Sequence, residues 1–353
     1  MNINVYKGAT GAKVLLKAVA CCAIVLAAAA CSMTGNNKAT DRKHFTNDVL
    51  LHYTPVKNQG YSSMCWAYAM LSTIETEHIQ MGDSVNLSVD YIARHLLAEQ
   101  ARCHFLSRGY DRVTLRGTAP LLLRLMYEYG IMPYDSYNAP NTNYNALAKR
   151  IVLLSNSSRN MSELGSRAER LFDERIGYLP KNVYMLGAEY TPEEFAHSVC
   201  MRGEYLAMTS FTHHRFGEAF VLEVPDNYSD ELFYNVPIDV LMKRIDRSLK
   251  NGHPVCWEGD TSEVGFAFKR GIAELTQRRP ITQKQRQIEF ENRQTTDDHC
   301  MSIIGIAHDN KGKRYYIAKN SWGTSNPYGG LMYMSEDYVR MKTIAIVVKN
   351  INM

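Results

Sequence analysis

The sequence predicts an α+β fold with two lobes, because helical patterns fill its first half and strand patterns fill its end. Apolar residues recur at helical spacing in three early segments, which are residues 65–80, 88–97 and 119–129. From residue 301 onward, short apolar runs alternate with turn sequences such as Asp309-Asn310-Lys311-Gly312. The chain has 353 residues, of which 45% are hydrophobic and 22% charged, and these values are typical of a globular protein with two packed subdomains.

The middle of the chain has a different character. Residues 141–203 begin with an Asn- and Ser-rich stretch and continue with two helical patterns, so we interpret them as a helical insertion. The second pattern opens with Thr191-Pro192-Glu193-Glu194, which has the N-cap residue, the early proline and the glutamate at the third position of a capping box. We therefore expect a helical lobe at 48–140 and a β-rich lobe at 204–353.

Within the β-rich lobe, one amphipathic helix is expected at 238–249, where Asn251-Gly252 follows and ends it. The strands are expected at 301–307, 314–319, 331–334 and 343–348.

The first thirty residues are predicted to be a signal peptide. Three lysines precede an acid-free apolar run at residues 18–30, and Cys31 follows this run. The run is shorter than the roughly 20 apolar residues of a membrane-spanning helix. Residues 26–31 resemble the cleavage site of a bacterial lipoprotein, which implies that Cys31 is lipidated and anchors the protein to the membrane; a plain secretory signal is the alternative. Residues 31–47 would then be a flexible tether, and their lack of an acidic run favours the periplasm over the cell surface.

The charge and the cysteines exclude several classes of protein. Without the first thirty residues the formal charge falls from +4 to +1, which argues against a nucleic-acid partner. Five cysteines follow Cys31, and their odd number and wide spacing indicate no disulfide framework. They are Cys65, Cys103, Cys200, Cys256 and Cys300. The sequence contains no metal-ligand spacing and no nucleotide fingerprint, so we expect neither a metal nor a cofactor.

The first chemical motif lies at residues 59–66. Cys65 stands at the start of a predicted helix, where the helix dipole lowers the pKa of a thiol and favours the nucleophilic thiolate. Gln59 precedes it on a loop, and its side-chain amide can form an oxyanion hole together with the backbone N–H of Cys65. Taken alone, a cysteine before a tryptophan is more often a small buried thiol.

The second and third motifs lie at the ends of predicted strands. His299 stands at the entrance of an apolar strand, and Asn320 follows another strand twenty-one residues later. An asparagine in that place can accept a hydrogen bond from the imidazole and fix its tautomer, while the indole of Trp322 shields the pair from water. Taken alone, the histidine is more often structural, and the segment that begins with Asn320 is also compatible with a simple turn.

Together, the motifs resemble the papain family of cysteine peptidases in order, local spacing and flanking residues. The matching segments are Pro55-Val56-Lys57-Asn58-Gln59-Gly60, Cys65-Trp66-Ala67-Tyr68, Asp298-His299 and Asn320-Ser321-Trp322-Gly323. His299 lies farther from Cys65 than the roughly 130–150 residues of the papain pattern, and the predicted insertion accounts for the excess. In two features the chain resembles the bleomycin hydrolase and aminopeptidase C branch of the family. It has an insertion of this kind, and it has Ser62 where secreted relatives have a disulfide cysteine.

The resemblance covers nearly everything after about residue 50 and implies a papain-like two-lobed fold. The helical lobe would carry the nucleophile, and a β-barrel-like lobe would carry the histidine and the asparagine. The implied roles are nucleophile for Cys65, base and then acid for His299, orientation for Asn320, oxyanion donor for Gln59, shielding for Trp322 and a substrate-pairing wall for Gly117. Ser63 replaces a glycine usual in the family, which would narrow the substrate cleft or alter its hydrogen bonding.

The resemblance implies a thiol peptidase that hydrolyses peptide or protein substrates through a thioester. We expect an endopeptidase, because the sequence ends at Met353 without the C-terminal arm that aminopeptidases of this branch extend into the cleft. The alternatives are an aminopeptidase of the bleomycin hydrolase type, an inactive peptide-binding lipoprotein on the same fold, and a transferase that uses an amine in place of water. The sequence leaves the oligomeric state open.

Overall fold

The computed structural model describes residues 43–185, 187–276 and 280–351. The predicted signal peptide, the lipidation site Cys31 and most of the predicted tether lie outside the described residues. Among the helices that are described, none has the length and hydropathy needed to cross a bilayer.

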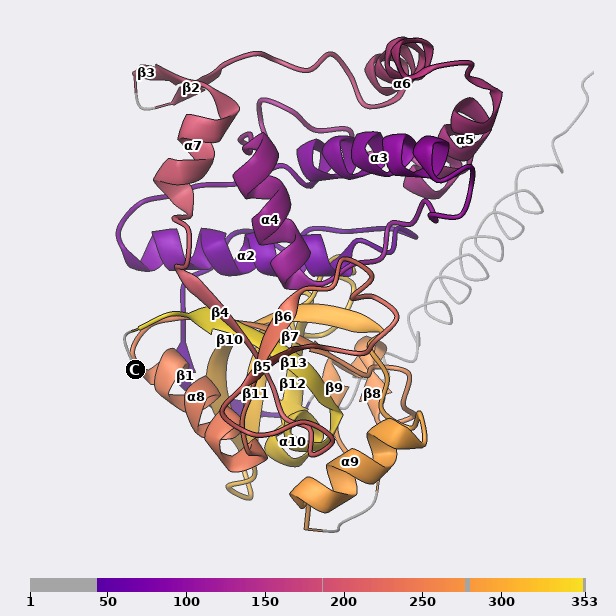
Figure 1. The fold of residues 1–353 in the computed structure, drawn as a ribbon. Helices are drawn as coiled ribbons and strands as arrows, with labels where there is room; N and C mark the ends of the chain where they lie inside the picture. The colour runs from indigo at the N-terminus through magenta and orange to yellow at the C-terminus, as the bar shows by residue number, and fades with distance from the viewer. Residues whose placement is uncertain (1–42, 186, 277–279, 352–353) are drawn as a thin grey trace, which may run out of the picture. The chain divides into compact units, whose positions relative to one another are not determined.

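Helices form one lobe of the unit that begins at His44 (Figure 1). They are α2 (Cys65–Gln80), α3 (Val89–Leu106), α4 (Ala119–Tyr129), α5 (Tyr144–Ser157), α6 (Met161–Arg175) and α7 (Pro192–Val199), with the hairpin of β2 (Val183–Met185) and β3 (Ala188–Tyr190) between the last two. Their apolar faces meet in one core, to which all six helices contribute buried side chains. The predicted insertion is therefore part of the helical lobe and not a separate module.

An eleven-stranded sheet forms the other lobe. Its hydrogen-bonded order is β5-β6-β4-β13-β7-β10-β11-β12-β9-β8, and β1 pairs with β10 outside this path. The strands are β1 (Phe45–Leu50), β4 (Tyr205–Thr209), β5 (Ala219–Val221), β6 (Leu232–Asn235), β7 (Val255–Gly259), β8 (Phe266–Ala267), β9 (Ile272–Ala273), β10 (His299–Asp309), β11 (Arg314–Lys319), β12 (Leu331–Ser335) and β13 (Thr343–Lys349). The helices α8 (Ile238–Lys250), α9 (Gln283–Glu291) and α10 (Glu336–Lys342) also belong to this lobe.

Helix α2 joins the two lobes. Almost all of its side chains are buried, because one face packs in the helical core and the other lies against the sheet. On the sheet side, the hydroxyl groups of Thr73 and Ser302 lie 2.9 Å apart. Farther along the helix, the Glu77 carboxylate accepts hydrogen bonds from Lys349 at 2.6 Å and His253 at 2.8 Å. These contacts hold the middle and the C-terminal half of α2 against the sheet lobe.

The α+β class is confirmed, and several predicted elements agree with the structure. The helices at 65–80 and 119–129 have the predicted bounds, and both hydrogen bonds of the capping box at Thr191 are present. The tether boundary was wrong, because residues 45–47 belong to β1 and pair with β10. The four strands predicted near the end of the chain lie within β10, β11, β12 and β13. The short strands β4 to β9 and the helices α9 and α10 were not predicted.

Candidate active site

Cys65 is the first residue of α2 and is almost fully buried. The N–H groups in the first turn of a helix have no partner inside that helix, so the Cys65 amide is available to a ligand. The loop just before the helix carries Gln59, whose side-chain Nε2 donates a hydrogen bond to the Ser62 carbonyl at 2.8 Å. An amide nitrogen has two hydrogens, so Gln59 retains one further donor.

His299 and Asn320 lie at the adjacent ends of two paired strands. His299 begins β10, and Asn320 directly follows β11. The imidazole Nε2 donates a hydrogen bond to the side-chain oxygen of Asn320 at 2.8 Å. Asn320 can only accept through that oxygen, so the tautomer with a free lone pair on Nδ1 is favoured. The indole of Trp322 covers the imidazole, with ring centroids 4.5 Å apart.

The surroundings of Cys65 favour its thiolate. The pKa of Cys65 lies well below its ordinary value, first because the Cys300 thiol donates a hydrogen bond to its sulfur and then because His299 hydrogen-bonds to it and attracts its negative charge. Burial acts in the opposite direction. The pKa of Cys300 is raised well above the ordinary value by the same hydrogen bond, so Cys300 stays a neutral donor. Cys300 directly follows His299, but sequence analysis gave it no role in the site.

The loops that carry Gln59 and Asn320 are tied together. The Ser321 hydroxyl donates a hydrogen bond to the side-chain oxygen of Gln59 at 2.6 Å. Two backbone bonds reinforce this contact, from the Gln59 N–H to the Ser321 carbonyl at 2.8 Å and from the Gly323 N–H to the Lys57 carbonyl at 3.1 Å. Ser321 therefore orients the amide that sequence analysis assigned to the oxyanion hole, although only its neighbours were singled out as functional.

Gly117 lies beside the buried Trp66 ring. A Cβ atom at this position would lie 2.9 Å from the Trp66 ring and 2.8 Å from Leu121, so no larger residue fits without a shift. The Trp66 indole also donates to the Leu115 carbonyl at 2.9 Å, which holds the same segment in place. Ser63, by contrast, is exposed just before α2.

A charged bridge that the sequence did not predict crosses from one lobe to the other next to Gly117. The Arg116 guanidinium forms an ion pair with the buried Asp226 and donates to the Asp297 carbonyl at 3.3 Å. The Asp226 N–H donates to the Asp297 carboxylate at 2.9 Å. Asp297 lies two residues before His299, so the bridge spans the lobes beside the candidate site.

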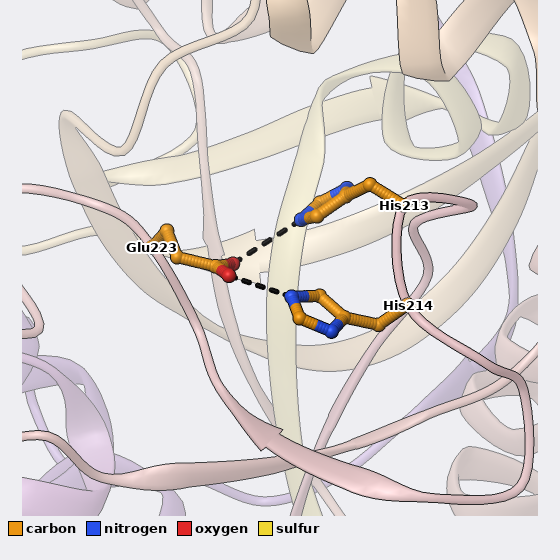
Figure 2. A group of neighbouring side chains, drawn as sticks. All are labelled: His213, His214 and Glu223. Carbon is orange, nitrogen blue, oxygen red and sulfur yellow. Dashed lines mark hydrogen bonds and ion pairs between the residues drawn. The ribbon is translucent and has the colours of Figure 1, made fainter.

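A second polar group lies on the loop after β4 and just beyond β5. Figure 2 shows His213 and His214 on either oxygen of the Glu223 carboxylate, at 3.2 and 2.6 Å. The side-chain oxygen of Gln287 accepts from the Thr212 N–H at 2.6 Å, so its Nε2 donates to Nδ1 of His213 at 3.0 Å. His213 then carries its proton on Nε2 and donates it to Glu223. That nitrogen has no lone pair for a metal, and we interpret the group as a hydrogen-bonded cluster.

The chain is similar to known proteins over most of its length. Residues 181–353 match the model of the Peptidase C1-like family. The chain is similar to aminopeptidase G of Lactobacillus delbrueckii subsp. lactis, with 23% identity over 83% of this chain and 80% of that protein. It is also similar to aminopeptidase E of Lactobacillus helveticus, with 22% identity and the same coverage. The crystal structure of PepW from Lactobacillus rhamnosis HN001 superimposes with a TM-score of 0.66 at 15% identity, covering 98% of this chain and 92% of that one.

Proposed function

Because this chain is a papain-like cysteine peptidase, we propose that it acts as an aminopeptidase, which removes residues from the free amino terminus of peptides. The Cys65 thiolate attacks the carbonyl carbon of the scissile bond, and the Cys65 N–H and the Gln59 amide hold the oxyanion. His299 gives its proton to the leaving amine, and a thioester remains on Cys65. His299 then takes a proton from water, which hydrolyses the thioester.

The observation that carries the proposal is the bridge of Arg116 with Asp226 and Asp297. A substrate that extends far to the amino-terminal side of the scissile bond would run beside Gly117 and meet this bridge. Asp226 is buried, and its backbone N–H is also held by the Asp297 carboxylate. Opening the bridge would therefore leave the Asp226 carboxylate without its guanidinium partner. Short amino-terminal segments avoid this cost. The names of the two curated relatives support the same activity, which differs from the endopeptidase that we expected from the sequence.

The decisive experiment uses one peptide in two forms, with a free and with an acetylated amino terminus. We expect mass spectrometry to find stepwise loss of residues from the free form and an uncut acetylated form. Cys65→Ala should lower the rate at least about 10³-fold and leave the fold intact. Interior cleavage of the acetylated peptide by the wild-type protein would favour an endopeptidase and overturn the proposal. No turnover of either peptide would instead favour an inactive binding protein.

We also propose that Cys31 carries a lipid that holds the peptidase at the periplasmic face of a bacterial membrane. The sequence of the first thirty-one residues supports this proposal. The wild-type protein expressed in bacteria should partition into the detergent phase of a Triton X-114 extract, and a Cys31→Ser variant should partition into the aqueous phase. Equal partitioning of the two proteins would contradict lipidation.

A further inference from the structure

Glu258 is a buried carboxyl group without a clear structural role. It lies on β7 and is 4% exposed. Its Oε1 atom is enclosed and has no hydrogen-bond partner among the residues that the structure describes. Leaving a buried carboxyl oxygen unpaired costs free energy, so an unpaired carboxyl group beside a candidate active site indicates a missing ligand.

The strand register places Glu258 next to the nucleophile. Glu258 lies directly opposite Cys300 in the antiparallel pair of β7 and β10, so the two side chains share one face of the sheet. Cys300 hydrogen-bonds to Cys65 on that face. Cys256, two residues before Glu258 and therefore on the same face, hydrogen-bonds to Thr73 of α2. The face with Glu258 is thus the one that α2 covers, and Glu258 lies toward the end of α2 that carries Cys65.

The groups around Glu258 are acidic. Burial raises its pKa well above the ordinary value, and the neighbours that raise it further are Asp297, Asp226 and Cys65, all of them acidic. Arg116 is paired with Asp226, and its other hydrogen bond goes to the backbone of Asp297. One guanidinium therefore lies beside the two carboxyl groups of Asp226 and Asp297. A cationic ligand next to Glu258 would accept no proton but would favour the ionised carboxylate, so the ligand would be held by charge as well as by hydrogen bonds.

We propose that Glu258, with Asp226 and Asp297 beside it, binds the protonated α-amino group of the substrate's first residue. This inference rests on the proposed aminopeptidase activity. In the residue that acylates Cys65, only Cα separates the amino nitrogen from the attacked carbonyl carbon, so the amino group must lie close to the Cys65 sulfur. An ammonium group offers three donors to the unpaired oxygen and its neighbours.

The same chemistry would suit a lysine side chain of the substrate, so the test separates the two sources. The substrates are alanyl-aminomethylcoumarin, its N-acetylated form, and N-acetylated lysyl-alanyl and norleucyl-alanyl coumarins. The variants are Glu258→Gln, which keeps the size of the side chain but can no longer ionise beside a cation, and Asp297→Asn. Glu263→Gln, an acid on the loop after β7, is the matched control.

We expect the wild-type protein to prefer the free amine over its acetylated form, and Glu258→Gln to lower that preference in kcat/KM at least tenfold, mainly through KM. Asp297→Asn should lower it less, and Glu263→Gln should leave it unchanged. An equal effect of Glu258→Gln on both substrates would overturn the inference and leave the aminopeptidase standing. A different result would be that the wild-type protein cleaves the lysyl substrate faster than the norleucyl substrate and that this difference is lost in Glu258→Gln. That result would assign the site to a lysine side chain of the substrate and would also overturn the inference. Equal use of free and acetylated alanine by the wild type would overturn the proposed function itself.

Discussion

At the scale of single residues, the Cys300 thiol determines how easily Cys65 ionises. Its hydrogen bond is the largest of the effects that lower the pKa of Cys65. Replacing Cys300 with alanine removes this donor and should raise the pKa of Cys65. The acid limb of the pH profile of kcat/KM should therefore move to higher pH by about one unit, since a hydrogen bond to a charged group contributes about 1.5–3 kcal/mol. Cys200→Ala, which changes a buried thiol that does not act on Cys65, should leave the limb in place. An unmoved limb in Cys300→Ala would show that His299 alone sets the ionisation.

The residues of the candidate site differ in how far the sequence could predict them. Cys65, His299 and Asn320 stand in short segments with distinctive neighbours, and the structure brings them together. Arg116, Asp226 and Glu258 carry no local signal, because their importance arises only when distant segments fold onto one another. Arg116 pairs with Asp226, which lies 110 residues later, and Glu258 lies near Cys65 of the other lobe. The local sequence around a charged residue does not show whether its side chain is exposed to solvent or forms a buried ion pair.

At the scale of elements, Gly130 fixes the junction between α4 and α7. It ends α4 with a φ of +83°, and a Cβ atom there would lie 2.3 Å from the backbone carbon of Pro192 at the start of α7. Because both the conformation and the space require glycine, Gly130→Ala should lower the free energy of unfolding by about 2 kcal/mol or more. Gly165→Ala is the matched control, since Gly165 lies inside α6 with open space around it and should gain about 0.5–1 kcal/mol. Urea unfolding of both variants measures the difference, and equal stabilities would contradict the role given to Gly130.

The sequence predicted long elements better than short ones. Helices of ten residues or more repeat their apolar pattern over several turns, whereas β5, β8 and β9 have only two or three residues and no measurable period. Such strands form because the neighbouring strands offer unpaired N–H and C=O groups, which is a property of the folded sheet. The strand β1 was missed for the same reason, since its pairing partner β10 lies more than 250 residues later.

At the scale of the whole molecule, the lobes meet through α2 and through buried charges. Glu77 binds Lys349 and His253 from the sheet lobe, and Arg116 binds Asp226. The two-lobed class followed from the order of helices and strands along the chain. The pairing of charges between lobes did not, because its partners lie more than one hundred residues apart in the sequence.

The buried Asp226 predicts how the stability of the whole protein depends on pH. Burial raises its pKa to about 7, and the Asp297 charge raises it further while Arg116 opposes the shift. In the unfolded chain an aspartate has a pKa of about 3.9. Between these values the folded protein binds more protons than the unfolded chain, so this contribution to stability is complete below about pH 4 and is lost as the pH rises through 7.

Asp226→Asn should remove the loss of stability that the ionisation of Asp226 causes as the pH rises. Its free energy of unfolding, followed by urea titration from pH 4 to pH 8, should gain on the wild-type value as the pH rises, by at most on the order of 4 kcal/mol. Asp239→Asn, which changes an exposed acid on α8 that pairs with Arg340, is the control and should keep the wild-type slope. Parallel profiles for Asp226→Asn and the wild type would mean that Arg116 keeps Asp226 ionised in the folded protein throughout this range. In that case the bridge between the lobes would be an ion pair at pH 4 as well as at pH 8. Any decline in stability that both proteins share as the pH rises would then have to come from Asp297 and Glu258, whose pKa values burial also raises.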